Sequence, residues 1–120
     1  MKKKILVFDK NTDILDMITL ILTQEGYIVD AIFNHDLVTK RIEEFQPDAI
    51  LLDVLSPTAQ GTALCESIKA AETTCHIPVI VLSTHPKYQV IKEICADEVI
   101  AKPFDIELLI SVVEEQLISA

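Results

Sequence analysis

The stretch "DAILLDVLSP" (residues 48–57) decides the fold. Four consecutive apolar residues run into the carboxylate of Asp53, and Ser56 and Pro57 follow shortly after it. An unbroken apolar run of this kind is typical of a strand that is covered on both faces of a sheet. Asp53 is then either a common turn residue, like Ser56 and Pro57, or a reactive group at the carboxyl end of a strand, where open parallel sheets carry their ligand sites.

Similar apolar runs alternate with segments of helical periodicity along the whole chain. We predict strands at residues 4–8, 27–32, 48–53, 77–83 and 98–101, and helices at residues 12–25, 35–45, 62–72, 87–95 and 105–118. Gly26 is expected to end the first helix, Asn34 to cap the second, and Gly61 to lie in the loop before the third. Because strands that alternate with helices pair in parallel, we expect an α/β protein with a doubly wound, five-stranded parallel sheet.

Length and composition restrict the class of protein. A chain of 120 residues suits one domain, residues 1–120, with no separate output domain. A hydrophobic fraction of 50% with only 5% aromatic residues predicts an aliphatic core. The net charge of −9 argues against a nucleic-acid partner, because a phosphate backbone calls for clustered Lys and Arg.

The sequence lacks the features of a secreted or membrane-spanning protein. The apolar run at residues 5–8 is too short for a secretion signal, and no stretch approaches the roughly 18 apolar residues of a membrane span. Cys65, Cys75 and Cys95 are odd in number and show no C-x-x-C spacing, so neither a disulfide framework nor a zinc site is indicated. We therefore expect a cytoplasmic protein with structural thiols and no membrane partner.

Polar residues follow four of the five predicted strands. The first run ends at Asp9 and Lys10, the third at Asp53, the fourth at Ser83 and Thr84, and the fifth at Lys102 and Pro103. Because the carboxyl ends of parallel strands lie along one edge of the sheet, these side chains are expected to form one site.

With this set of residues in this order, the chain resembles the CheY-like receiver domain of two-component response regulators over essentially its whole length. The resemblance implies a flavodoxin-like fold with strand order 2-1-3-4-5. It also implies that Asp53 accepts a phosphoryl group from a sensor histidine kinase or phosphotransfer protein, and that Lys102 and Ser83 contact the phosphoryl oxygens. Asp9 and Asp53 would hold Mg²⁺, and the Lys102–Pro103 peptide would be cis. Such a domain is a phosphoacceptor in signalling, not an enzyme.

The chain departs from the family pattern after the first strand. Active receivers usually have two adjacent acids there, giving three carboxylates and one lysine with a net charge of −2. Here Lys10 follows Asp9, so two carboxylates face two ammonium groups and the net charge is zero. Since Mg²⁺ is held by oxygen ligands, we predict weak magnesium binding. Lys10 either takes the place of the cation in a salt bridge to Asp53 or bends away to solvent.

A second departure concerns the switch that follows phosphorylation. An aromatic residue commonly occupies the position of Val99, where it swings inward when the hydroxyl residue of the preceding strand binds phosphate. A valine has no such large two-state side chain. A switch in this chain would depend on Ser83 and backbone movement, or on another residue such as Tyr88.

Four functions remain to be compared. The leading one is a stand-alone receiver that binds an unknown downstream protein through the face made by residues 87–95, 98–101 and 105–118. The alternative is a phosphorylation-independent pseudo-receiver, a protein-binding module, because Lys10 replaces a magnesium-binding acid. A phosphatase with an Asp nucleophile would need a second acid where Leu55 stands, and a flavodoxin-type carrier would need a Gly-rich loop after the first strand. His35, His76 and His85 lack ligand spacing and are taken as non-catalytic.

Overall fold

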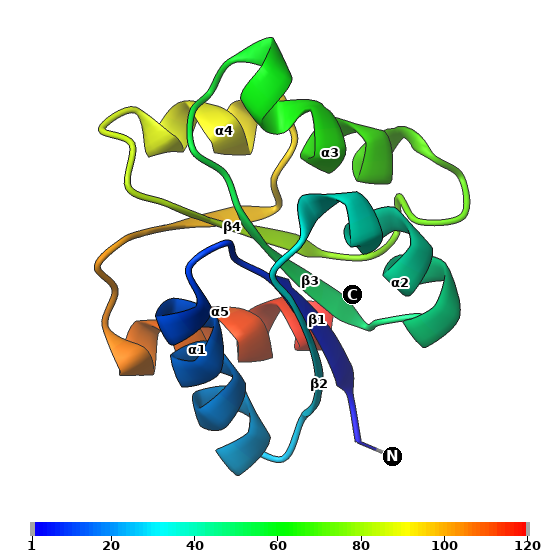
Figure 1. Cartoon of the computed structure of the whole chain (residues 1–120), viewed down its shortest axis with the longest axis vertical. Helices are drawn as coiled ribbons and strands as arrows, with labels where there is room; N and C mark the ends of the chain where they lie inside the picture. Colours follow the sequence, from blue (N-terminus) through cyan, green and yellow to red (C-terminus); the bar gives the residue numbers. More distant parts are fainter. Residues whose placement is uncertain (1, 120) are drawn as a thin grey trace.

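The computed structural model describes residues 2–119 as one parallel sheet with helices on both faces (Figure 1). The strands lie in the order β2-β1-β3-β4-β5, which confirms the predicted flavodoxin-like fold. In chain order the elements are β1 (Lys4–Phe8), α1 (Thr12–Gln24), β2 (Ile28–Ile32), the 3₁₀ helix η1 (His35–Leu37), α2 (Val38–Phe45), β3 (Ala49–Asp53), α3 (Ala59–Ala70), β4 (Val79–Ser83), α4 (Tyr88–Ile94), β5 (Glu98–Ala101) and α5 (Ile106–Ser119).

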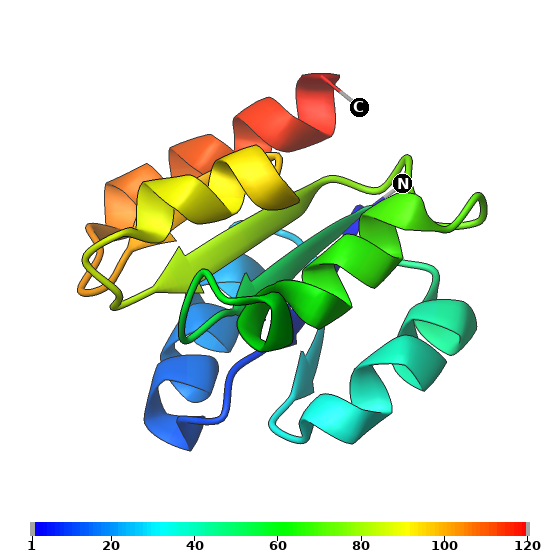
Figure 2. The same cartoon turned by 90° about the horizontal axis from the view of Figure 1, so that it is seen from above.

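The core consists of two layers that the sheet separates. Helices α2, α3 and α4 pack on one face and α1 and α5 on the other, as Figure 1 shows. Seen from above in Figure 2, α3 and α4 lie over β3 and β4. Alternate residues of β3 point into opposite layers: Ile50 and Leu52 into one, Leu51 into the other. Most of the core side chains are Ile, Leu and Val, so the predicted aliphatic core is confirmed.

The ends of the first two helices follow the local sequence. Gly26 has a φ of +94° and its N–H donates to Thr23 O at 3.0 Å, while Tyr27 N donates to Leu22 O at 3.1 Å. This is the arrangement that a glycine permits just beyond a helix, and it confirms the predicted stop. Asn34 caps as expected, with its side chain accepting from Asp36 N. The first turn it caps is η1, so α2 itself begins three residues later than predicted.

Helix α3 begins earlier than predicted, at Ala59, because Thr58 caps it. Thr58 Oγ1 accepts a hydrogen bond from Gly61 N at 3.0 Å, which places Gly61 in the first turn of the helix and not in the loop. Gly61 packs against the loop that follows Asp53. A Cβ atom there would lie 2.3 Å from Ser56 O, closer than two such atoms can approach. The other boundaries agree with prediction to within two residues.

The cysteines divide into two kinds. All three thiols are free; Cys65 is buried in the core and Cys95 is half-buried, as structural thiols would be. Burial raises the pKa of the Cys65 thiol far above its usual range. Cys75 is also free but exposed. In the part of the chain that the structure describes, no helix has the length and apolar character to cross a membrane.

The contact between Gly61 and Ser56 yields a first prediction. In an ordinary helix, Gly→Ala adds about 1 kcal/mol of stability. Here Gly61→Ala is expected to lower the free energy of unfolding by about 1–3 kcal/mol, as overpacking does, because the new methyl group meets backbone. Urea denaturation measures the change. Gly26→Ala is the control: its Cβ meets nothing within 4 Å, and it should lose about 1 kcal/mol through backbone strain alone. A more stable Gly61→Ala protein would show that the loop after Asp53 is free to move.

Candidate functional site

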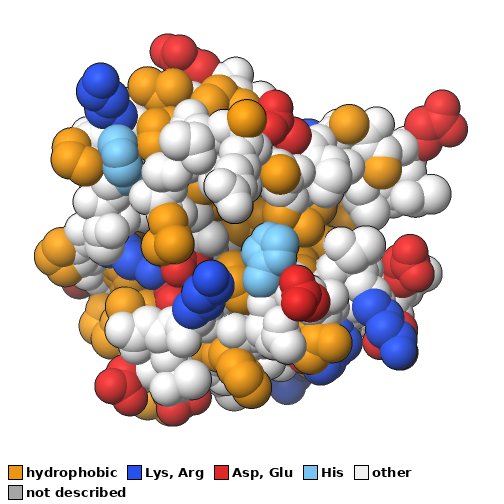
Figure 3. Space-filling model, turned by 45° about the horizontal axis from the view of Figure 1, so that its top comes forward, with side chains coloured by type: hydrophobic (Ala, Val, Ile, Leu, Met, Phe, Trp, Pro, Cys, Tyr) orange, Lys and Arg blue, Asp and Glu red, His pale blue; other side chains and the backbone are white. Residues whose placement is uncertain are grey.

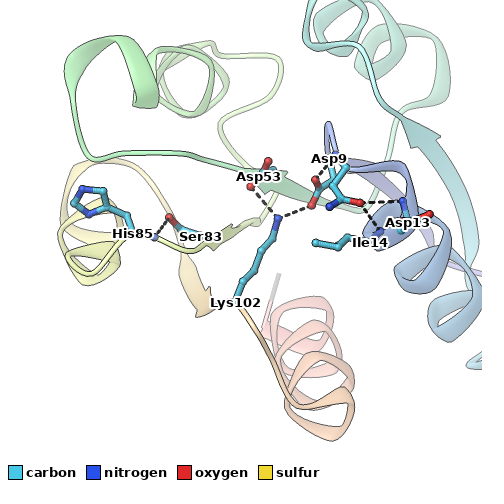
Figure 4. Close-up of polar contacts among 8 residues, drawn as sticks. Asp9, Asp13, Ile14, Asp53, Ser83, His85 and Lys102 are labelled. Atoms are coloured by element: carbon cyan, nitrogen blue, oxygen red, sulfur yellow. Dashed lines mark hydrogen bonds and ion pairs between the residues drawn. The ribbon is translucent and has the colours of Figure 1, made fainter.

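The sheet gathers the predicted polar residues at its carboxyl edge. Asp9 follows β1, Asp53 ends β3, Ser83 ends β4 and Lys102 follows β5. The strand register explains why they meet: Phe8 pairs with Leu52, Asp53 with Leu82 and Ser83 with Ala101. Figure 4 shows Lys102 reaching from the end of β5 across β4 toward the two aspartates.

The Lys102 ammonium lies between two carboxylates. Its Nζ is 2.6 Å from Asp9 Oδ2 and 2.9 Å from Asp53 Oδ1. All three side chains are almost fully buried: Lys102 is 7% exposed, Asp9 1% and Asp53 9%. Lys102 N also donates to Ser83 O at 2.8 Å, and the Lys102–Pro103 peptide is cis, as predicted. The two ion pairs and the burial show that this lysine points inward, and we call Lys102, Asp9 and Asp53 the Lys102 triad.

Asp9 is fixed by hydrogen bonds on all sides. Its Oδ1 accepts from Asn11 N at 2.9 Å, and its own N–H donates to Ile32 O at 3.1 Å. The Asn11 side chain in turn caps α1 by accepting from the N–H groups of Asp13 and Ile14. Both carboxylate oxygens of Asp9 are thus occupied, one by Asn11 and one by Lys102.

Asp53 differs from Asp9 because one of its oxygens has no hydrogen bond within residues 2–119. Oδ1 accepts from Lys102, whereas Oδ2 points away from the lysine (Figure 4). Desolvation by burial raises the pKa of Asp53, and the Asp9 charge raises it further. The hydrogen bond and charge of Lys102, and the charge of Lys10, act in the opposite direction. The result is a partly desolvated carboxylate with one oxygen available, which is what a nucleophile requires.

A cleft of about 690 Å³ opens beside Asp53. Its walls include Lys10, Phe33, His35 and Leu55. Figure 3 shows that acidic, basic, histidine and apolar side chains surround a hollow on this face. His35 packs edge-on against Phe8, with ring centroids 5.7 Å apart. From the sequence, His35 is expected to be non-catalytic because it lacks ligand spacing. Its position just after β2, the neighbour of β1, is the sequence signal that predicts its place at this edge.

Lys10 does not form the salt bridge to Asp53 that was one of its two expected arrangements. Within residues 2–119, the ammonium group that pairs with Asp53 belongs to Lys102, and Lys10 is exposed. The second expected arrangement is the one found: Lys10 extends toward solvent, while Lys102 supplies the ammonium between the two carboxylates and pairs with Asp53 Oδ1. Lys10 still lines the cleft with Asp53, and its charge contributes to the pKa of that carboxyl.

Ser83 lies at the edge but bonds elsewhere. Its Oγ accepts from His85 N at 3.1 Å, and the side chain is 1% exposed. Among the described residues, no hydrogen bond joins the Ser83 hydroxyl to Asp53 or Lys102. Ser83 does not cap α4 either, because that helix begins after Lys87 without a side-chain cap. Its hydroxyl hydrogen remains available as a donor.

The donor set fits a magnesium ion poorly. Mg²⁺ requires near-octahedral coordination by oxygen atoms, usually from more than one carboxylate. Asp9 has both oxygens occupied, Asp53 has one left, and a lysine stands at position 10. In the described part of the chain, no three His, Cys, Asp or Glu side chains are grouped so that they could hold a metal ion.

Comparison with known proteins agrees with this geometry. The response regulator receiver domain family matches residues 5–114. A curated relative, the DNA-binding dual master transcriptional regulator RpaA of Synechocystis sp., is 31% identical over 116 residues, which are 90% of this chain and 46% of that protein. The chain spans about half the length of the curated relatives it matches.

Solved structures give the same result. The receiver domain of a signal transduction histidine kinase from Syntrophus aciditrophicus is 30% identical, with a TM-score of 0.86 over 98% of this chain and 92% of that one. A CheY-like receiver domain protein from Methanospirillum hungatei is 27% identical, with a TM-score of 0.86 over 99% and 96% of the two chains. By fold, by the residues at the edge of its sheet and by sequence, the chain belongs to the response regulator receiver domain family.

Proposed function

We propose that this domain is a phosphoacceptor in which Asp53 receives a phosphoryl group from a sensor histidine kinase or a phosphotransfer protein in the cytoplasm. Receiver domains are signalling domains, not enzymes in the usual sense, so chemistry beyond self-catalysed transfer and autodephosphorylation is not expected. The observation that carries the proposal is the Lys102 triad: a buried ammonium holds Asp53 at the edge of the sheet while Oδ2 is left without a hydrogen bond beside the cleft.

Each residue of the edge has a proposed role in the transfer. Phosphoryl transfer proceeds through a loose transition state, so a protein contributes mainly positioning and charge stabilisation. Asp53 supplies the attacking oxygen, and Lys102, whose ammonium has a third proton, pairs with a phosphoryl oxygen. Ser83 donates its hydroxyl to another oxygen, because that hydroxyl accepts from His85 N and keeps its own proton free. Asp9 holds Lys102 in place.

The output is proposed to be the binding of a downstream protein at the face made by α4, β5 and α5. Val90 and Ile94 on α4 and Leu108 on α5 are large apolar side chains exposed to solvent. Val99 on β5 is half-buried and packs against the core. Since a valine cannot swing as an aromatic side chain does, a change at Asp53 would reach this face through Ser83, whose carbonyl is bonded to Lys102 N.

A pseudo-receiver is the second candidate, and one observation favours it. Lys102 already pairs with both carboxylates in the unmodified protein, and a lysine stands where an acid normally follows the first strand. In this candidate the fold and the partner face are kept while Asp53 is never efficiently phosphorylated, and the partner binds constitutively. Phosphorylation of the natural protein separates the two candidates.

The first test of the proposal is the site of modification. Incubation with acetyl phosphate, followed by intact mass spectrometry, should add one phosphoryl group to the natural protein and none to Asp53→Asn. Asp16→Asn, at an exposed position of α1, is the matched control and should be modified like the natural protein. Stoichiometric phosphate on Asp53→Asn would contradict the assignment, and no phosphate on the natural protein would favour the pseudo-receiver.

The second test concerns magnesium. Receiver domains typically use Mg²⁺ for phosphorylation, and Asp9 and Asp53 would be the protein ligands here. We predict weak binding to the natural protein and at least tenfold tighter binding to Lys10→Asp, which returns the net charge from zero to −2 and adds an oxygen ligand. Titration at fixed ionic strength, followed by NMR, measures both affinities. Equal affinities would mean that residue 10 does not contribute to the cation site.

The third test concerns the charge held at Asp53. Because burial raises the folded-state pKa of Asp53 above its ordinary 3.8, the folded state binds more protons than the unfolded state between these two values, and stability falls as the pH rises through them. Asp53→Asn removes this charge and should be more stable than the natural protein at pH 7 by about 1 kcal/mol. The difference should shrink as the pH falls toward 3.8, as urea denaturation can show. If Asp53→Asn were less stable than the natural protein at pH 7, the claim that the Asp53 carboxylate destabilises the fold would be wrong.

A further inference from the structure

The magnesium site that the family implies is incomplete in this chain, and a lysine stands where an acid is missing. Of the four carboxylate oxygens of Asp9 and Asp53, three accept hydrogen bonds within the described residues: two from Lys102 and one from Asn11 N. Oδ2 of Asp53 is the remaining one. A divalent cation would therefore meet one available protein oxygen in the triad and the ammonium of Lys10 nearby.

Lys10 is placed to act on whatever occupies that oxygen. It directly follows Asp9 and lines the same cleft as Asp53. Lys10 takes part in no ion pair among residues 2–119, and its exposed, flexible stem lets the ammonium move within the cleft.

The charges match those of a receiver with its metal bound. Exchange of an acid for a lysine changes the charge of the pocket by +2, which is the charge of one Mg²⁺. When the carboxylate of Asp53 becomes an acyl phosphate dianion, one negative charge is added beside Asp9. Lys10 and Lys102 together then oppose three negative charges, whereas Lys102 alone would oppose four in a pocket with the usual acid and no metal.

We propose that Lys10 contacts the phosphoryl group on Asp53 in place of a divalent cation, so that this domain accepts phosphate without a metal. The inference rests on the proposed function of Asp53 as phosphoacceptor. Asp53 Oδ2 forms a bond to the phosphorus of an acyl phosphate, the bond from phosphorus to the donor oxygen breaks, and the carboxylate of the donor leaves with the electron pair. No proton moves, and the charge is conserved. Lys10 and Lys102 stabilise the negative charge on the transferred oxygens.

The test compares four proteins with and without metal. Acetyl phosphate is added to each protein in buffer with EDTA or with excess Mg²⁺. The proteins are the natural one, Lys10→Met, Lys10→Asp and Lys40→Met, the matched charge control at an exposed position of α2. The natural protein and Lys40→Met should react at rates within about threefold of each other, whichever buffer is used. Lys10→Met should be slower by about tenfold or more in EDTA, because a charge on the transferred oxygens is lost. Lys10→Asp should react only with Mg²⁺.

A second measurement does not depend on the chemical step. Beryllium fluoride imitates a phosphoryl group on a carboxylate, and NMR can follow its binding in metal-stripped buffer. The natural protein should bind it as tightly without Mg²⁺ as with it, Lys10→Met should bind it about tenfold more weakly, and Asp53→Asn should not bind it.

The outcomes separate the inference from the proposed function. A natural protein that needs Mg²⁺ for both reaction and beryllium fluoride binding, or a Lys10→Met protein that equals it in both, would overturn the role of Lys10. Beryllium fluoride binding that depends on Lys10, without acyl phosphate in any protein, would support the anion site and overturn the phosphoacceptor function. Absence of both acyl phosphate and beryllium fluoride binding would overturn both.

Discussion

The contact on which the rest of the structure depends is the Lys102 ammonium shared by Asp9 and Asp53. Two carboxylates at the ends of adjacent strands would repel each other, and both are nearly buried. They are compatible only because β5 places a cation between them from two strands away. Removing Lys102 would leave both carboxylates without a cation, and leaving a buried charge without compensation typically costs about 3–5 kcal/mol. The strand order therefore determines where Lys102 points, and Lys102 in turn determines the electrostatic environment of Asp53.

The two edges of the sheet use their polar groups differently. At the amino edge, hydrogen bonds fasten neighbouring elements together: Lys4 Nζ donates to Phe45 O, and Asp97 accepts from both Lys69 Nζ and Val79 N. At the carboxyl edge, bonds hold Asp9 and Lys102 but leave one oxygen of Asp53 without a partner. Burial raises the pKa of that carboxyl. The carboxyl edge thus retains one carboxylate oxygen that the fold leaves without a partner among residues 2–119, and such local departures from full satisfaction are expected at functional sites.

The periodicity of the sequence predicts the arrangement of strands and helices, but it does not predict the side-chain contacts of the site. The alternation of strands and helices determines that Asp9, Asp53, Ser83 and Lys102 share an edge, and the structure places all four there. The exposed position of Lys10, the acceptor role of Ser83 toward His85 and the packing of His35 on Phe8 depend on side-chain rotamers and on tertiary packing. The start of α3 was missed for a local reason. Gly61 resembles a loop residue in sequence, but it lies in the first turn of the helix that Thr58 caps, and it is a glycine because Ser56 leaves no room for a Cβ atom.

A lysine ammonium does not act as a bound magnesium ion does, even where both change the charge of the pocket by the same amount. A magnesium ion is strongly oriented by its octahedral shell and must first be captured, so its effect depends on its concentration. Lys10 is always present, but it is a point charge on a flexible stem in an exposed position, where salt screens it. Lys102, buried and held by Asp9 and by the backbone at Ser83, supplies the orientation that Lys10 lacks. One lysine fixed in the core and one mobile at the mouth of the cleft divide between them the two tasks, position and charge, that a single cation performs in a receiver with the usual acids.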